Sequence, residues 1–126
     1  MIRAISLLTT LALSGPAAAQ TQTEINRQAA ARTMVADVTM TQQWRAVYAQ
    51  MKRLDAQEPS GVGGSGYAAA ALESQRAWLP FRDRQCFIEA GEYYGGSISP
   101  TVRAQCLTRL THERTVQLKN LIWTNR

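Results

Sequence analysis

Apolar residues recur at steps of three and four along the first half of the chain, which is the spacing of one face of an α-helix. Between Glu24 and Leu54 the sequence contains neither glycine nor proline. Thr21 and Glu24 have the spacing of a capping box, which favours a helix start near Gln22. We therefore predict a first helix over residues 22–54. Its apolar face consists of Ile25, Ala29, Val35, Val38, Trp44, Val47, Tyr48, Met51 and Leu54.

This first helix is long for a domain of this size. At the usual rise per residue it spans about 45 Å, whereas a compact domain of such a chain measures only about 35 Å across. We therefore expect its N-terminal turns to overhang the other helices, to fray or to bend.

Two more helical patterns follow a flexible, glycine-rich linker over residues 56–66. The second helix is predicted over 67–90, with a kink or a break between Ala77 and Leu79 because Pro80 removes a backbone hydrogen bond. The third is predicted over 100–123, starting at Pro100 with Ser99 as its cap. Its expected buried side consists of Val102, Cys106, Leu110, Val116, Leu118 and Leu121. Because no alternating β pattern of useful length occurs, we predict an all-α, three-helix up-down bundle.

The N-terminus has the features of a secretory signal peptide over residues 1–19. Arg3 precedes a short apolar run, and three alanines at positions 17–19 provide a small-residue cleavage site before Gln20. The apolar run is far shorter than the roughly 20 residues that span a bilayer. We therefore expect cleavage near Ala19–Gln20 and a periplasmic or secreted protein made of one helical domain, residues 20–126.

The chain has two cysteines, Cys86 and Cys106. In an exported chain of this size they are expected to form one disulfide, which would join the second helix to the third. The alternative is a pair of free, buried thiols. If the disulfide forms, the antiparallel register places Asp83 opposite Arg109, so these two residues are a candidate ion pair between the helices.

The formal net charge is +5, and cations concentrate toward the C-terminus. From Ser97 onward Glu113 is the one acidic residue, whereas the cations are Arg103, Arg109, Arg114, Lys119 and Arg126. This distribution fits either an anionic partner, such as a membrane surface, cell-wall polymer or acidic protein, or a solvated helix face. Nucleic acid is not an expected partner of an exported protein.

The sequence offers little for catalysis, and we predict no catalytic site, no cofactor and no metal. The single histidine, His112, has no second ligand at metal-binding spacing. Glu89 and Glu92 could in principle act as an acid and base pair, but they lie at a helix end without an evident cleft. Gln75, Trp78 and Arg82 share one face of the second helix. That face is either an anchor for a protein partner or core packing beside a long cationic side chain.

Several motifs resemble the lysozyme inhibitor LprI-like N-terminal domain family, which includes the YecT-like proteins. They are Gln75-Arg76-Ala77-Trp78, Arg82-Asp83 and Cys86, then Gly95-Gly96-Ser97-Ile98, Cys106-Leu107-Thr108 and the run from Leu110 to Thr115, which contains Arg114. Asp37 fits an acidic position of the first helix. Two departures are Pro80 and the three alanines at 29–31, where many relatives carry a further cysteine. Gln75, Arg76, Trp78, Arg82, Asp83, Arg109 and Arg114 are the residues expected to be structural.

The resemblance implies an exported helical protein that binds a protein partner and, in the family's namesake, inhibits lysozyme. We expect a periplasmic inhibitor of lysozyme or a related cell-wall-degrading muramidase. Its expected contact surface is the loop of Tyr93, Tyr94, Gly95, Gly96 and Ser97 together with the Arg82 face. An acidic patch of Asp55, Glu58, Glu89 and Glu92 would attract a cationic enzyme.

The alternative is a non-inhibitory envelope protein. In that case Arg103, Arg114 and Lys119 of the basic third helix would dock on anionic lipid or cell wall. The sequence does not decide the oligomeric state.

Overall fold

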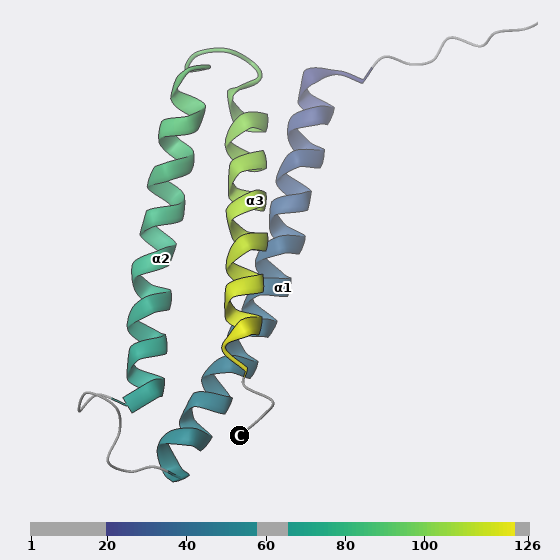
Figure 1. Ribbon diagram of the computed structural model, residues 1–126. Helices are drawn as coiled ribbons and strands as arrows, with labels where there is room; N and C mark the ends of the chain where they lie inside the picture. Colours follow the sequence, from purple (N-terminus) through teal and green to yellow (C-terminus); the bar gives the residue numbers. More distant parts are fainter. Residues whose placement is uncertain (1–19, 58–65, 123–126) are drawn as a thin grey trace, which may run out of the picture.

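The structure is a computed structural model, and it describes residues 20–57 and 66–122. These residues form three helices: α1 (Gln22–Gln57), α2 (Gly66–Gly91) and α3 (Ser99–Asn120), with no strand in the described ranges. Each helix runs antiparallel to the one before it (Figure 1). The predicted all-α, three-helix up-down bundle is therefore confirmed. The expected signal peptide lies outside the described residues, as do Glu58 and Arg126.

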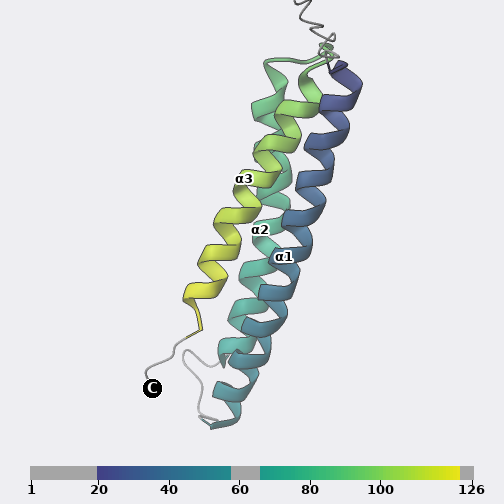
Figure 2. The ribbon, with the colours of Figure 1, turned by 90° about the vertical axis from the view of Figure 1, so that its right-hand side faces the viewer.

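The first turns of α1 pack on the rest of the bundle. Thr21 Oγ1 accepts the backbone N–H of Glu24 at 3.2 Å, so one half of the expected capping box forms. Asn26 Nδ2 donates to the carbonyl of Ser97 at 3.1 Å, and the Asn26 amide oxygen accepts the hydroxyl of Thr101. The expected overhang or fraying at this end is wrong because the bundle is rod-shaped rather than round, and α1 lies along its length (Figure 2).

The start of α2 is fixed by a side chain from the end of α1. The carboxylate of Asp55 accepts the backbone N–H groups of Tyr67 at 2.7 Å and Ala68 at 2.9 Å, so it caps α2 from outside that helix. Gly66 has φ +72°, and a Cβ there would lie 2.9 Å from Asp55 Oδ2. Both helices extend into the predicted linker, because α1 continues to Gln57 and α2 begins at Gly66.

Proline does not interrupt α2. The helix continues from Gly66 to Gly91 with Pro80 inside it, so the predicted break before Pro80 is wrong. Pro80 removes the hydrogen bond to the carbonyl of Arg76, and both residues are exposed. Water can therefore solvate the carbonyl that the proline leaves without a partner, which lowers the cost of the proline.

The start of α3 differs from the prediction in its cap. Pro100 is in the first turn as expected, but the N-cap residue is Ile98, without a side-chain hydrogen bond. Ser99 belongs to the helix, and its hydroxyl donates to the carbonyl of Ala90 at 3.5 Å. The prediction of Ser99 as the cap is therefore wrong. At the other end α3 stops at Asn120, three residues before the predicted end.

Two apolar clusters form the core, and Trp78 packs against both. One contains Met40, Val47, Met51 and Leu118, and the other surrounds the disulfide with Leu110. Some predicted core positions are wrong, since Val35, Val38, Val116 and Leu121 are exposed. The buried positions that the apolar pattern missed are Ala36, Met40, Thr101, Ala104, Thr111 and Arg114.

Cys86 and Cys106 form the predicted disulfide, with their Cα atoms 5.4 Å apart. Both residues are buried, and the bond joins α2 to α3 one helix turn or more from the intervening loop. The alternative of two free thiols is therefore excluded.

Replacing Cys86 and Cys106 together with alanine should lower the free energy of unfolding by about 3 kcal/mol, because the bond closes a loop of roughly 20 residues in the unfolded chain. Urea denaturation followed by circular dichroism measures this change. A loss below about 1 kcal/mol would show that the disulfide is not a main constraint on the fold.

Candidate functional site

Two guanidinium groups lie over the indole ring of Trp78, which is partly buried and packs against both apolar clusters. The guanidinium carbon of Arg82 is 5.2 Å from the indole ring centroid, and that of Arg114 is 5.8 Å from it. Arg82 comes from α2, one turn after Trp78, and Arg114 comes from α3. Both cations therefore interact with the electron-rich faces of the ring, and the interaction is strengthened where the groups are shielded from water.

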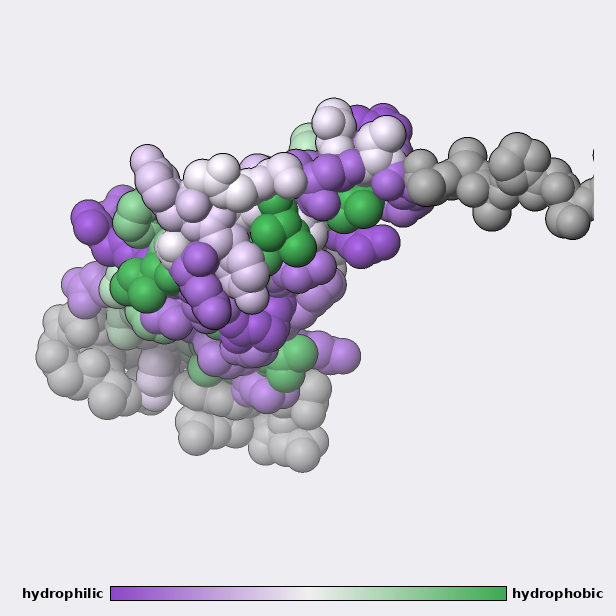
Figure 3. Space-filling view, turned by 90° about the horizontal axis from the view of Figure 1, so that it is seen from above, coloured by the Kyte–Doolittle hydropathy of each residue, from purple (hydrophilic) through white to green (hydrophobic). Residues whose placement is uncertain are grey.

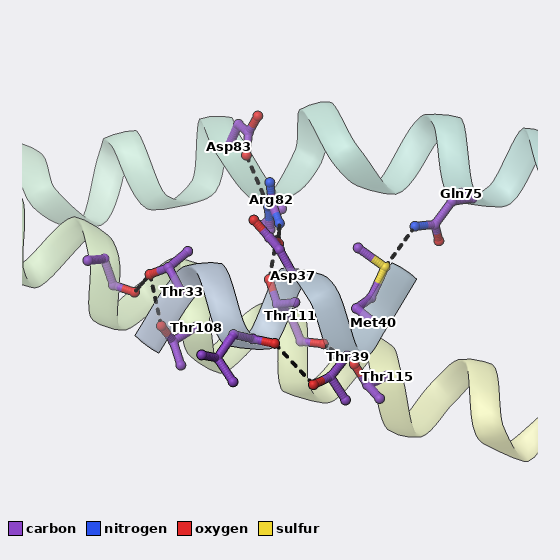
Figure 4. Close-up of polar contacts among 12 residues, drawn as sticks. Thr33, Asp37, Thr39, Met40, Gln75, Arg82, Asp83, Thr108, Thr111 and Thr115 are labelled. Atoms are coloured by element: carbon purple, nitrogen blue, oxygen red, sulfur yellow. Dashed lines mark hydrogen bonds and ion pairs between the residues drawn. The ribbon is translucent and has the colours of Figure 1, made fainter. Parts of the chain in front are cut away.

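Arg82 connects all three helices (Figure 4). Its Nη1 donates to Asp37 Oδ1 of α1 at 2.6 Å and to Thr111 Oγ1 of α3 at 3.1 Å, while its Nε donates to Asp83 Oδ1 at 3.0 Å. Only 11% of the Arg82 side chain is exposed. Two nitrogens of the planar guanidinium thus bind three acceptors in fixed directions, an arrangement that a lysine could not reproduce.

Arg114 is a buried cation without a carboxylate partner among the described residues. Only 8% of the surface of Arg114 is exposed to solvent. Its hydrogen-bond acceptors are neutral: Gln75 Oε1 at 3.0 Å, Ser74 Oγ at 2.9 Å and Gln117 Oε1 at 3.2 Å. Desolvation lowers the pKa of Arg114. The neutral partners and the indole ring therefore replace water around this charge.

Gln75 completes the network from the α2 side. Besides accepting from Arg114, it donates through Nε2 to Met40 Sδ of α1 at 3.2 Å (Figure 4). Of the two interpretations of the Gln75–Trp78–Arg82 face, the contacts favour core packing. Every buried side-chain nitrogen and oxygen in the described ranges has a hydrogen-bond partner, so the network is complete.

Two of the expected structural residues lie outside this network. Arg76 is exposed. Arg109 does not pair with Asp83 as predicted, since its Nη2 contacts Glu89 Oε2 at 2.9 Å and its Nη1 lies 3.5 Å from Glu113. Hydrogen bonds from Gln85 and from Arg109 lower the pKa of Glu89. The long Arg109 side chain reaches past the disulfide level toward the end of α2, whereas Asp83 turns to Arg82.

The α2–α3 loop, residues 92–98, is ordered by its own backbone. The N–H of Tyr93 donates to Ala90, that of Tyr94 to Gly91 and that of Gly96 to Tyr93, at 3.0, 3.1 and 3.0 Å. Gly95 has φ +79°, a conformation that favours glycine. Asn26 of α1 holds the carbonyl of Ser97, as described above. Tyr94 is nevertheless 90% exposed, so the loop presents an aromatic side chain from a fixed backbone.

Three expected surfaces are not assembled as predicted. Asp55 of α1 lies beside the start of α2, where it caps that helix, whereas Glu89 and Glu92 lie at the other end of α2. The two ends of α2 are about 35 Å apart by helix rise, so the acidic patch does not exist as one surface. The loop and the Arg82 face do not form a joint contact surface, because Arg82 points into the bundle. Arg114 is buried, so the basic third-helix surface retains Arg103 and Lys119 among the described residues.

The described residues contain no group of three or more His, Cys, Asp or Glu side chains that could hold a metal ion. His112 is exposed on α3. None of the helices in the described ranges is long and apolar enough to cross a membrane.

The sequence missed the partners that complete the network. Ser74, Met40, Thr111 and Gln117 carry no distinctive pattern, and neither does the Thr33–Thr108 hydroxyl pair, 3.0 Å apart, which joins α1 to α3. Helical spacing is the sequence feature that could have predicted the two threonines of α3, since Thr108 and Thr111 follow the buried Ala104 at steps of four and three.

The fold and its central network define a disulfide-bonded three-helix bundle with polar core contacts. The profile of the family described as lysozyme inhibitor LprI matches residues 14–118, so the chain belongs to this family. It is also 36% identical over 132 residues to an uncharacterized protein of Rhizobium meliloti strain 1021, covering 94% of this chain and 92% of that protein. No solved structure matches the chain.

Replacing Arg82 with lysine keeps the charge but removes the fork that reaches Asp37, Asp83 and Thr111. We expect the free energy of unfolding to fall by about 1–3 kcal/mol, the usual cost of losing hydrogen bonds that involve a charged, largely shielded group. Urea denaturation measures it. The matched control is Arg84→Lys at an exposed neighbouring position, which should change stability by less than about 0.5 kcal/mol. Equal effects of the two substitutions would contradict the connecting role of Arg82.

Proposed function

We propose that this protein is exported and inhibits lysozyme or a related cell-wall-degrading muramidase by direct binding. Membership of the LprI family supports inhibition, and the sequence of residues 1–19 supports export to the periplasm or beyond. The proposed action needs no catalytic group in this chain, because an inhibitor has only to occupy the cleft of its target.

The exposure of Tyr94 on an ordered loop is the observation that supports the choice of contact surface. Large aromatic side chains dominate the binding energy of many protein interfaces. A loop that is already held by backbone hydrogen bonds, by Asn26 and by the nearby disulfide loses little conformational freedom on binding. The loop of Tyr93, Tyr94, Gly95, Gly96 and Ser97 is therefore the proposed contact surface.

The charge near this loop is negative, whereas the whole chain is positive, so the loop end suits a cationic enzyme better than the other surfaces do. Residues 89–98 contain Glu89 and Glu92 and no lysine or arginine. Glu89 is engaged by Arg109, while Glu92 is exposed. The chain is cationic overall, so an approach that leads with this end reduces the repulsion of a basic enzyme.

Replacing Tyr94 with alanine should weaken inhibition at least tenfold, because it removes the most exposed aromatic side chain of the loop. The measurement is lysozyme activity on purified cell wall, titrated with the oxidised protein at physiological salt. The matched control is Phe81→Ala, which removes an exposed aromatic side chain from the helical part of α2 and should leave the inhibition constant within about twofold. Both variants should keep the wild-type circular dichroism spectrum.

Two outcomes separate the parts of this proposal. If the wild-type protein does not inhibit, inhibition of lysozyme is wrong. If the wild type inhibits and Tyr94→Ala inhibits equally well, the protein is an inhibitor but the loop is not its contact surface.

A further inference from the structure

Three large apolar side chains of α2 face solvent on one side of the helix. Phe81 is 54% exposed, and Phe87 and Ile88 are each 69% exposed. Phe81, Arg84 and Ile88 follow one another at steps of three and four, and Ala77 precedes Phe81 by four residues, so these four residues lie on one helical stripe. Pro80 and Phe87 lie beside it. This stripe is turned away from Gln75, Trp78 and Cys86, which face the core. We call the residues Ala77, Pro80, Phe81, Arg84, Phe87 and Ile88 the outer face of α2.

The outer face of α2 is at the edge of the bundle. Figure 1 shows α2 as an outer helix with α3 beside it, and the view in Figure 3 shows apolar residues reaching the surface in separate patches among polar ones. Scattered apolar side chains are normal on a protein surface, but two phenylalanines and an isoleucine exposed on one side of a single helix form a candidate binding surface.

Cations accompany this apolar stripe. Arg84 lies within it and Arg76 at its border; both are exposed, and neither has an ion-pair partner among the described residues. The acidic residues nearby are Asp83, which is bound to Arg82, and Glu73 at the beginning of the stripe. The outer face of α2 therefore combines exposed aromatic groups with two arginines that have no ion-pair partner among the described residues, and its electrostatic complement is an anionic, partly apolar surface.

The shape of the face decides between a bilayer and a protein groove. The exposed triplet of α1, formed by Met34, Val35 and Val38, borders hollows; one of about 340 Å³ is lined by Val35 together with Thr108 and His112 of α3. Such a surface suits a shaped protein partner. All residues of the outer face of α2 come instead from that single helix. A fluid lipid interface can deform around the side of one helix without a preformed groove, and it accepts phenylalanine and isoleucine at the depth of the acyl boundary.

We propose that the outer face of α2 binds the surface of anionic lipid bilayers. The helix lies parallel to the membrane, with Phe81, Phe87 and Ile88 inserted below the headgroups and Arg76 and Arg84 at the level of the phosphates. The α2–α3 loop follows the end of this helix, so binding holds the loop close to the membrane surface. The inference does not depend on inhibition of lysozyme.

The test is sedimentation of the oxidised protein, residues 20–126, with vesicles of phosphatidylcholine alone or mixed with phosphatidylglycerol. We expect binding to the anionic vesicles that weakens as salt is raised. The combined substitution Phe81→Ser, Phe87→Ser and Ile88→Ser should weaken it at least tenfold. The matched control, Met34→Ser, Val35→Ser and Val38→Ser, removes an equally exposed apolar triplet from α1 and should change binding less than twofold. Circular dichroism verifies that each variant is folded.

The charge contribution is tested separately with Arg76→Gln and Arg84→Gln. This pair should weaken binding to anionic vesicles and reduce its salt dependence, while leaving any binding to phosphatidylcholine unchanged. The proposal is overturned if the wild type does not prefer anionic vesicles, or if the α1 triplet matters as much as the α2 triplet. It is also overturned if sedimentation velocity shows a dimer that the α2 triplet abolishes, because the face would then join two copies of this chain.

Discussion

The contact of Arg82 and Arg114 with the indole ring of Trp78 is the interaction on which the rest of the bundle depends. Each arginine would be costly to bury alone, because its charge loses the solvation of water. Here the indole ring, the carboxylate of Asp37 and the neutral oxygens of Gln75, Ser74, Gln117 and Thr111 supply substitute partners. Since these partners come from all three helices, the arginines are satisfied only when the helices are in register. The network therefore favours one arrangement of helices that apolar packing alone would specify less strictly.

The disulfide and the cap from Asp55 act at opposite ends of α2. Cys86–Cys106 joins α2 to α3 near their connecting loop, while Asp55 of α1 holds the first N–H groups of α2 at the other end. The loop next to the disulfide is then ordered by its backbone bonds and by Asn26. The same contacts that pack the start of α1 on α3 thus also help to order the exposed loop, because Asn26 binds both Thr101 and the carbonyl of Ser97. That link connects the fold to the proposed binding of a muramidase through Tyr94.

Periodicity was sufficient for the class of fold. It predicted three helices, their antiparallel order and the helix start near Gln22, and the paired cysteines in an exported chain predicted the disulfide. It failed for Val35 and Val38 because valines at near-helical steps were counted as buried. Val38 lies on the far side of α1 from Ala36 and Met40, and Val35 lies at the edge of the contact between α1 and α3. The position of Arg82 and Arg114 also could not follow from hydropathy. Burial of an arginine depends on acceptors from other helices, and a sequence pattern does not display them.

The motif that resembles the family signature is thus mainly a description of the bundle's interior, with Gln75, Trp78 and Arg82 facing inward. The surfaces that distinguish this chain lie elsewhere, on the loop with Tyr94 and on the outer face of α2. This separation explains why a family motif can identify the fold securely while the partner has to be inferred from exposed residues. It also means that substitutions in the motif should affect folding first and binding only as a consequence.

A double-mutant cycle on Gln75→Leu and Arg114→Leu tests the central network most directly, with the free energy of unfolding measured by urea denaturation. Each single substitution leaves a buried polar group without its partner, whereas the double substitution removes both. We expect the double variant to be about 1–2 kcal/mol more stable than the sum of the single effects implies. Strict additivity of the two substitutions would contradict it, because Gln75 and Arg114 would then contribute independently rather than as one buried pair.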